Sequence, residues 1–180
     1  MTYETIHSEI IYRGSIFDVR KDQIRLPNGE IHQLDIVDHP GAVTLLPIDE
    51  KNQIWFVRQY RQGAHQELLE LPAGSIELGE DPAVCAQRES REEIGMAARN
   101  LQLLGRFYLA PGYSTELLYA YLATDLYPAP LTADSDEFLS VIALPIGDVI
   151  QMAEKGEILD GKTLATLYLA KPLIESLLNK

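Results

Sequence analysis

The residues with the clearest chemical potential lie between Gly74 and Met96, where five glutamates are interspersed with two arginines. The carboxylates of Glu89, Glu92 and Glu93 fall at positions i, i+3 and i+4, so a helix would carry them on one face. Like charges at this spacing repel unless cations neutralise them. Such oxygens suit Mg²⁺ or Mn²⁺, which accept phosphate oxygens as further ligands. A solvated acidic helix face paired with the arginines is the alternative, and the spacing alone leaves both open.

A helix is expected to position these carboxylates. Asp81 can cap its first turn, and Pro82 suits the first helical position, where no amide hydrogen is needed. Gly95 is a typical stop, so the helix should extend to about Ile94. A stripe of small and apolar side chains should pack this helix against a sheet; it consists of Ala83, Ala86, Ser90 and Ile94.

The segments around this helix read mainly as strands. Two hairpins are expected, one from 16–25 and 31–37 and the other from 42–48 and 54–60. Further strands are expected at 67–71, 101–109, 116–123 and 138–144. Helices are expected at 146–155 and 162–178. Strands outnumber helices, and the helices lie mid-chain and at the end, which predicts an α+β layered domain.

Composition limits the class of protein. The chain has 180 residues, which fits one domain or one domain with a small appendage. Its 27 acidic and 15 basic residues give a net charge of −12, which argues against a nucleic-acid binder. No apolar stretch is long enough to span a membrane, and the N-terminus does not read as a signal peptide. Because Cys85 is the only cysteine, a disulfide framework is excluded and a cytoplasmic protein is expected.

The acidic segment resembles the Nudix box. It holds the glycine, acidic and basic positions of that signature at matching spacing: Gly74, Glu80, Arg88, Glu89, Glu92, Glu93 and Gly95. Ser90 stands where the family usually has an aliphatic residue. That position faces the fold rather than the metal, so the difference concerns packing more than catalysis.

The resemblance extends along nearly the whole chain. Within that family the chain is similar to the ADP-ribose pyrophosphatase branch. Pro111, 16 residues after Gly95, is one mark of this branch. The other similar segments are 58–61, 70–74, 110–116 and 134–138. Relatives that act on GDP-mannose and other nucleotide sugars share much of this context.

The resemblance implies a Nudix fold, in which a mixed β-sheet is sandwiched between helices. It also implies an N-terminal antiparallel β-hairpin region at 1–40, followed by the Nudix hydrolase domain at 41–180. In the ADP-ribose branch, the N-terminal region packs across a twofold dimer and each substrate pocket borrows residues from its partner. A homodimer is therefore expected here.

Carried over by position, the resemblance implies a site for two or more Mg²⁺ or Mn²⁺ ions. Its ligands would be the carboxylates of Glu89, Glu92 and Glu93 and the backbone carbonyl of Ala73. Arg88 would orient the carboxylates by ion pairing, and Glu80 would brace the loop. Gly74 and Gly95 would permit backbone geometry that a side chain would obstruct.

The catalytic base in this branch usually comes from a glutamate before a late strand, and Glu137 is the best positional match. Asp134 and Asp136 are the alternatives, as is a merely polar loop. Arg88 and Glu92 would assist at the catalytic centre.

Four residues resemble the substrate-binding positions of the branch: Arg58, Arg61, Pro111 and Glu116. Arg61 could pair with phosphate or stack on the base, with a surface salt bridge as the alternative. Glu116 is similar in position to the residue that holds the terminal ribose.

The function expected from the resemblance is metal-dependent hydrolysis of the pyrophosphate bond of ADP-ribose or a related nucleoside diphosphate sugar. The alternative enzymes act on GDP-mannose, dinucleoside polyphosphates, NADH, oxidised nucleotides or capped RNA, and the net charge argues against RNA. A non-catalytic ADP-ribose sensor is a further alternative. Such sensors typically have a degraded box, whereas every acidic box position is present here.

Overall fold

We analysed the protein in a computed structural model, in which residues 2–132 and 138–178 are described. The chain divides into two compact units. The first comprises residues 1–41 and 107–117, and the second comprises residues 42–106 and 118–180.

The first unit contains a three-stranded antiparallel sheet in the order β1 (Glu4–Arg13), β2 (Asp18–Arg25) and β3 (Ile31–Asp38). The predicted hairpin is confirmed in β2 and β3. Its turn closes through hydrogen bonds from the Leu26 amide to the Glu30 carbonyl and from the Gly29 amide to the Leu26 carbonyl. Every residue of β1 is exposed, so this sheet buries little on its own.

The second unit is built around β4 (Ala42–Pro47), whose six residues are all buried. This strand pairs antiparallel with β7 (Ala73–Ser75) and parallel with β9 (Leu117–Pro128). With β8 (Met96–Tyr108) they form a mixed sheet in the order β7-β4-β9-β8. A separate antiparallel sheet has the order β10 (Leu139–Pro145), β5 (Gln53–Arg61), β6 (Gln66–Glu70).

The predicted hairpin of 42–48 with 54–60 is wrong. Its strands exist as β4 and β5, but they belong to different sheets, and the bridge between Ile48 and Ile54 lies beyond the end of β4. β4 is buried on both faces, which is typical of a central strand, and both of its edges are occupied by β7 and β9.

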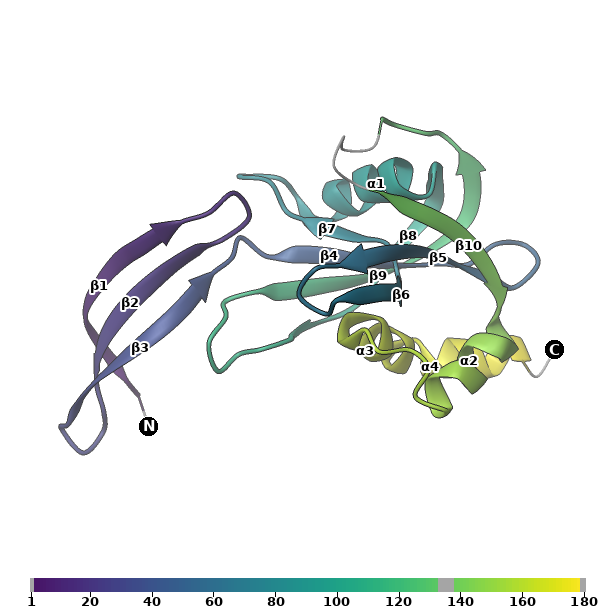
Figure 1. Ribbon diagram of the computed structural model, residues 1–180. Helices are drawn as coiled ribbons and strands as arrows, with labels where there is room; N and C mark the ends of the chain where they lie inside the picture. Colours follow the sequence, from purple (N-terminus) through teal and green to yellow (C-terminus); the bar gives the residue numbers. More distant parts are fainter. Residues whose placement is uncertain (1, 133–137, 179–180) are drawn as a thin grey trace. The chain divides into compact units, whose positions relative to one another are not determined.

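Helices cover both faces of the mixed sheet, as Figure 1 shows for α1 (Pro82–Glu93) on one side and α2 (Ile146–Glu154), α3 (Gly161–Leu169) and α4 (Lys171–Leu178) on the other. Side chains alternate along β4, so it contributes to two hydrophobic clusters. Val43 and Leu45 pack with Cys85 and Ala86 of α1, while Leu46 belongs to the cluster that includes residues of α2, α3 and α4. The α+β class and the sheet between helices are confirmed.

The single helix predicted over 162–178 is two helices. α3 ends with its C-cap at Ala170, and α4 begins at Lys171. Pro172 has no amide hydrogen and its ring crowds the preceding turn, which explains the break. Among the described residues, no helix is long and apolar enough to cross a membrane.

Candidate active site

Helix α1 carries the box carboxylates and has the predicted ends. Asp81 is its N-cap and accepts a hydrogen bond from the amide of Ala83 at 2.8 Å, with Pro82 in the first turn. At the other end Gly95 has φ +69°, a conformation that glycine adopts without strain. These local signals fix where the helix begins and ends, and hence which way its carboxylates face.

Arg88 lies at the centre of the box. Its Nε and Nη2 donate to the two carboxylate oxygens of Glu80, both at 3.0 Å. Its Nη1 donates to Glu89 at 2.6 Å and to Glu92 at 2.9 Å. One guanidinium therefore holds the loop before α1 and two carboxylates on the helix.

This arrangement shifts the proton affinities of both partners. The hydrogen bond from Arg88 is the main reason that the pKa of Glu80 falls to about 2. The same hydrogen bond, with the charge of Glu89 and the hydrogen bonds to Glu92 and Glu89, raises the pKa of Arg88 above its usual value. Both groups remain ionised throughout the physiological range.

Two of the predicted metal ligands, Glu89 and Glu93, are buried beside β7. Glu89 is 7% exposed and Glu93 is 4% exposed. The backbone amide of Ala73 donates to Glu93 at 3.0 Å. A Cβ at Gly74 would overlap the carboxylate of Glu89, so this glycine makes the space that Glu89 occupies.

A second charged network lies in the same unit, and the sequence indicates only one part of it, an ion pair of Arg61 without its partners. Arg61 on β5 donates from Nε and Nη2 to the two oxygens of Glu70 on β6, at 2.7 and 2.8 Å. Lys162, at the start of α3, ion-pairs with the same carboxylate and with Asp160 at 2.9 Å. Asp160 also caps α3 through the amide of Thr163. The network joins two strands to a helix.

The electrostatics of this network link it to the box. Hydrogen bonding to Glu70 is the main cause that raises the pKa of Arg61, and the negative charge of Glu93 adds to it. Burial raises the pKa of Glu70, but the hydrogen bond from Arg61 and the charge of Lys162 hold it below its ordinary value. Arg61 is therefore within electrostatic reach of Glu93 on α1.

Comparisons with known proteins identify the family. Residues 38–167 match the model of the NUDIX domain, and residues 3–33 match the nucleoside diphosphate sugar hydrolase N-terminal domain. The chain belongs to the Nudix family. It is 35% identical over 162 residues to the ADP-ribose pyrophosphatase of Bacillus subtilis (strain 168), with 89% of this chain and 88% of that one covered.

This Nudix protein is also similar to a second curated protein and to a solved structure. It is 37% identical over 169 residues to the methanol dehydrogenase activator of Bacillus methanolicus, covering 92% of this chain and 91% of that one. A crystal structure of an ADP compounds hydrolase has the same fold, with a TM-score of 0.85 over 98% of this chain and 96% of that chain at 24% identity. The predicted Nudix fold is confirmed.

Nudix hydrolases depend on divalent metal ions, and the residues of the box would have to hold them. Within residues 2–132 and 138–178, no group of three or more acidic, histidine or cysteine side chains is arranged as a metal site. The donor set nevertheless fits a hard cation, because three carboxylates share one face of α1 and Gly74 leaves space for one of them. Arg88 supplies the positive charge for Glu89 and Glu92 in this arrangement.

Gly74→Ala should weaken metal binding to this Nudix box. The new methyl group would displace the carboxylate of Glu89. We expect the affinity for Mg²⁺ to fall by about 10–100-fold, as when a group that orients a metal ligand is lost. Titration calorimetry with Mg²⁺ measures it. Gly63→Ala is the matched control, because a Cβ there meets no atom within 4 Å. Equal affinities for all three proteins would contradict the expectation.

The structure brings only part of the predicted site together. Glu80, Arg88 and the box carboxylates share one unit with Arg61 and with Arg58, which is exposed on β5. Pro111, which is exposed, and Glu116, which is half-buried, belong to the first unit. The proposed base Glu137 and its alternatives Asp134 and Asp136 lie outside the described residues. The roles of all these residues stay predictions.

Proposed function

We propose that this chain hydrolyses the pyrophosphate bond of ADP-ribose or a related nucleoside diphosphate sugar, giving a nucleoside monophosphate and a sugar phosphate. The observation that carries the proposal is the box of a Nudix chain in which Arg88 holds carboxylates of α1 in place. The similarity to a protein named ADP-ribose pyrophosphatase supports the substrate class.

In this proposal the residues that hold Mg²⁺ or Mn²⁺, two or more ions per site, are Glu89, Glu92, Glu93 and the carbonyl of Ala73. Bound ions would neutralise phosphate charge and lower the pKa of a coordinated water. Arg88 keeps the carboxylates oriented and Glu80 keeps Arg88 in place. The shared face of these carboxylates on α1 and the space that Gly74 leaves for Glu89 support the ligand role.

The remaining predicted residues would act on the substrate and the attacking water. Glu137 would accept the proton of the water as the new P–O bond forms and the bridging P–O bond breaks. Arg61 and Arg58 would pair with phosphate, and Glu116 would hold the terminal ribose, with Pro111 shaping its loop. Arg61 is 43% exposed while ion-paired to Glu70, which supports a guanidinium held in one orientation and still accessible to a ligand.

The first unit has a separate part in the proposal. We propose that residues 1–40 mediate a homodimer and contribute to the substrate pocket, and that residues 41–180 carry the hydrolase domain. Large apolar side chains exposed on the three strands support this; they include Ile6, Ile10, Ile11, Tyr12, Ile31 and Leu34. A monomer in light scattering at micromolar concentration would contradict it. A cytoplasmic location, with no nucleic-acid partner, also remains part of the proposal.

A substrate panel tests the proposed function. ADP-ribose, GDP-mannose, ADP-glucose, NADH and dinucleoside polyphosphates are incubated with the protein and Mg²⁺, and phosphate-containing products are quantified. We expect the highest kcat/KM on ADP-ribose or another nucleoside diphosphate sugar. Preference for NADH or a dinucleoside polyphosphate would move the chain to another Nudix specificity. Binding of ADP-ribose without turnover of any substrate would favour a sensor and overturn the proposal.

A further inference from the structure

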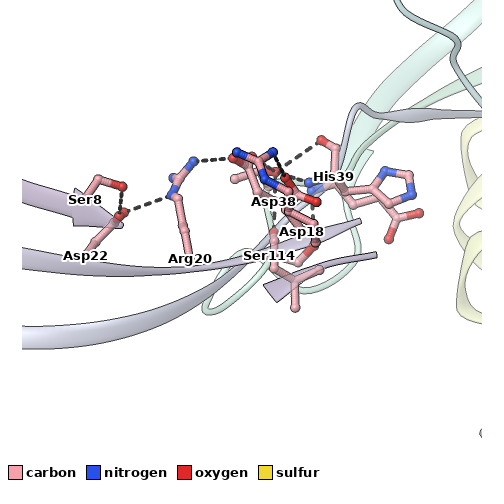
Figure 2. A network of polar contacts seen from close by, with 11 residues as sticks. Ser8, Asp18, Arg20, Asp22, Asp38, His39 and Ser114 are labelled. Carbon is pink, nitrogen blue, oxygen red and sulfur yellow. Dashed lines mark hydrogen bonds and ion pairs between the residues drawn. The ribbon is translucent and has the colours of Figure 1, made fainter. Parts of the chain in front are cut away.

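A chain of polar contacts crosses the three-stranded sheet of the first unit, as Figure 2 shows. The hydroxyl of Ser8 on β1 donates to Asp22 on β2 at 2.6 Å. Arg20 donates from Nε to Asp22 at 3.1 Å and from Nη1 to Asp38 at 2.8 Å. A single guanidinium therefore links the middle of β2 to the end of β3.

The contacts continue from β3 into the segment that carries Glu116. The hydroxyl of Thr115 accepts the amide hydrogen of His39 at 2.8 Å and lies 3.2 Å from an oxygen of Asp38, to which it can donate. Backbone hydrogen bonds from Val37 to Tyr113 and from Thr115 to Val37, at 2.8 and 3.0 Å, flank this point. Thr115 is thus held through its amide and its hydroxyl.

Burial and charge make this network stiff. Asp22 is 7% exposed, and its carboxylate receives hydrogen bonds from both Ser8 and Arg20. Burial lowers the pKa of Arg20, but the carboxylates of Asp38 and Asp22 together outweigh this effect and raise the pKa above its ordinary value. The guanidinium therefore stays charged at all working pH values. Arg20 uses different nitrogens for the two carboxylates, which fixes the plane of its guanidinium.

We propose that Arg20, Asp38 and Thr115 are positioning residues that set the direction of the Glu116 side chain toward a bound terminal ribose. The inference rests on the role of Glu116 in the proposed function. Glu116 directly follows Thr115, and its amide donates to the hydroxyl of Ser114 at 3.2 Å. Fixing the backbone of Thr115 therefore fixes the position of the Glu116 Cα atom, from which the side chain projects. The N-terminal sheet then controls substrate affinity although it carries no box residue.

Thr115→Val is the primary test, because it removes the hydroxyl and keeps the branched shape. We expect KM for ADP-ribose to rise about tenfold with kcat within about twofold, in line with the loss of one hydrogen bond to a charged group. Thr115→Ser should restore KM, because it restores the hydroxyl. Ser176→Ala removes a hydroxyl from an exposed position of α4, far from the proposed site in sequence, and as the control it should leave both constants unchanged.

A double variant separates positioning from general damage. Glu116→Gln should raise KM by itself, and Thr115→Val should add no further rise in that background if it acts through Glu116. Asp38→Asn keeps an acceptor but loses the charge facing Arg20, so it should raise KM less than Thr115→Val. Additive effects of Thr115→Val and Glu116→Gln, or an unchanged KM in Thr115→Val, would overturn the inference.

Calorimetry with ADP-ribose distinguishes failure of this inference from failure of the proposed function. Weaker binding by Thr115→Val than by the wild type supports the positioning role even if no substrate is turned over. Equal binding by the two proteins overturns it even if hydrolysis is observed. Absence of ADP-ribose binding to the wild type would overturn both proposals.

Discussion

Replacing Glu137 by Gln is expected to lower kcat about 10²–10⁴-fold and to leave the KM for the nucleotide nearly unchanged. A general base contributes only when the proton is transferred in the transition state, so its loss is a defect of turnover rather than of binding. Steady-state kinetics at saturating Mg²⁺ measure both constants. Asp134→Asn and Asp136→Asn are the matched controls. If one of them lowers kcat while Glu137→Gln does not, the base assignment is wrong.

Glu93→Gln separates metal binding from base catalysis. It removes one of the proposed anionic ligands from the face of α1 and keeps the shape of the side chain. Metal binding should weaken, and excess Mg²⁺ should recover part of the lost activity, whereas excess Mg²⁺ should not rescue Glu137→Gln. If neither Glu137 nor the two aspartates affects kcat, Glu92 becomes the next candidate for the base.

The second large effect is expected on stability. Lys162→Met should lower the free energy of unfolding by about 1.5–3 kcal/mol, because it removes one of the two cations that are hydrogen-bonded to the buried carboxylate of Glu70. Glu70 is 1% exposed, and the cation of Lys162 neutralises its charge together with Arg61. Urea unfolding of the wild type and the variant measures the difference.

Two further variants make the stability experiment specific. Glu70→Leu combined with Lys162→Met removes both charges and should recover part of the loss. Lys171→Met breaks an ion pair with Glu175 in which both side chains are more than half exposed, so it should cost at most about 1 kcal/mol. A loss in Lys162→Met no larger than in Lys171→Met would contradict the importance of the buried network.

Local signals predicted much of this structure. The cap at Asp81, the proline after it and the glycine at 95 act within one turn of α1, so sequence was enough to bound that helix. Helical spacing likewise placed Glu89 and Glu93 on a common face. The turn residues 26–30 between β2 and β3 were sufficient to predict their hairpin.

Where tertiary contacts decide, sequence was not enough. A turn follows β4, but whether it closes a hairpin depends on β7 and β9, which take both edges of β4. Glu70, at the end of β6, and Lys162, at the start of α3, are far apart in sequence. They meet only in the folded chain, where they form an ion pair. The one local hint was a glutamate between Leu69 and Leu71 at the end of a strand that becomes buried.

The parallel pairing of β4 with β9 also determines the order in which the chain can fold during synthesis. β4 is entirely apolar or uncharged, and the strand that covers its parallel edge, β9, begins only at Leu117, well after β4 ends at Pro47. Until then one edge of β4 stays uncovered even when β7 has paired with the other edge, and exposed strand edges are prone to aggregate. Translation speed between β4 and β9 should therefore influence the yield of folded protein more than the speed of any later stretch.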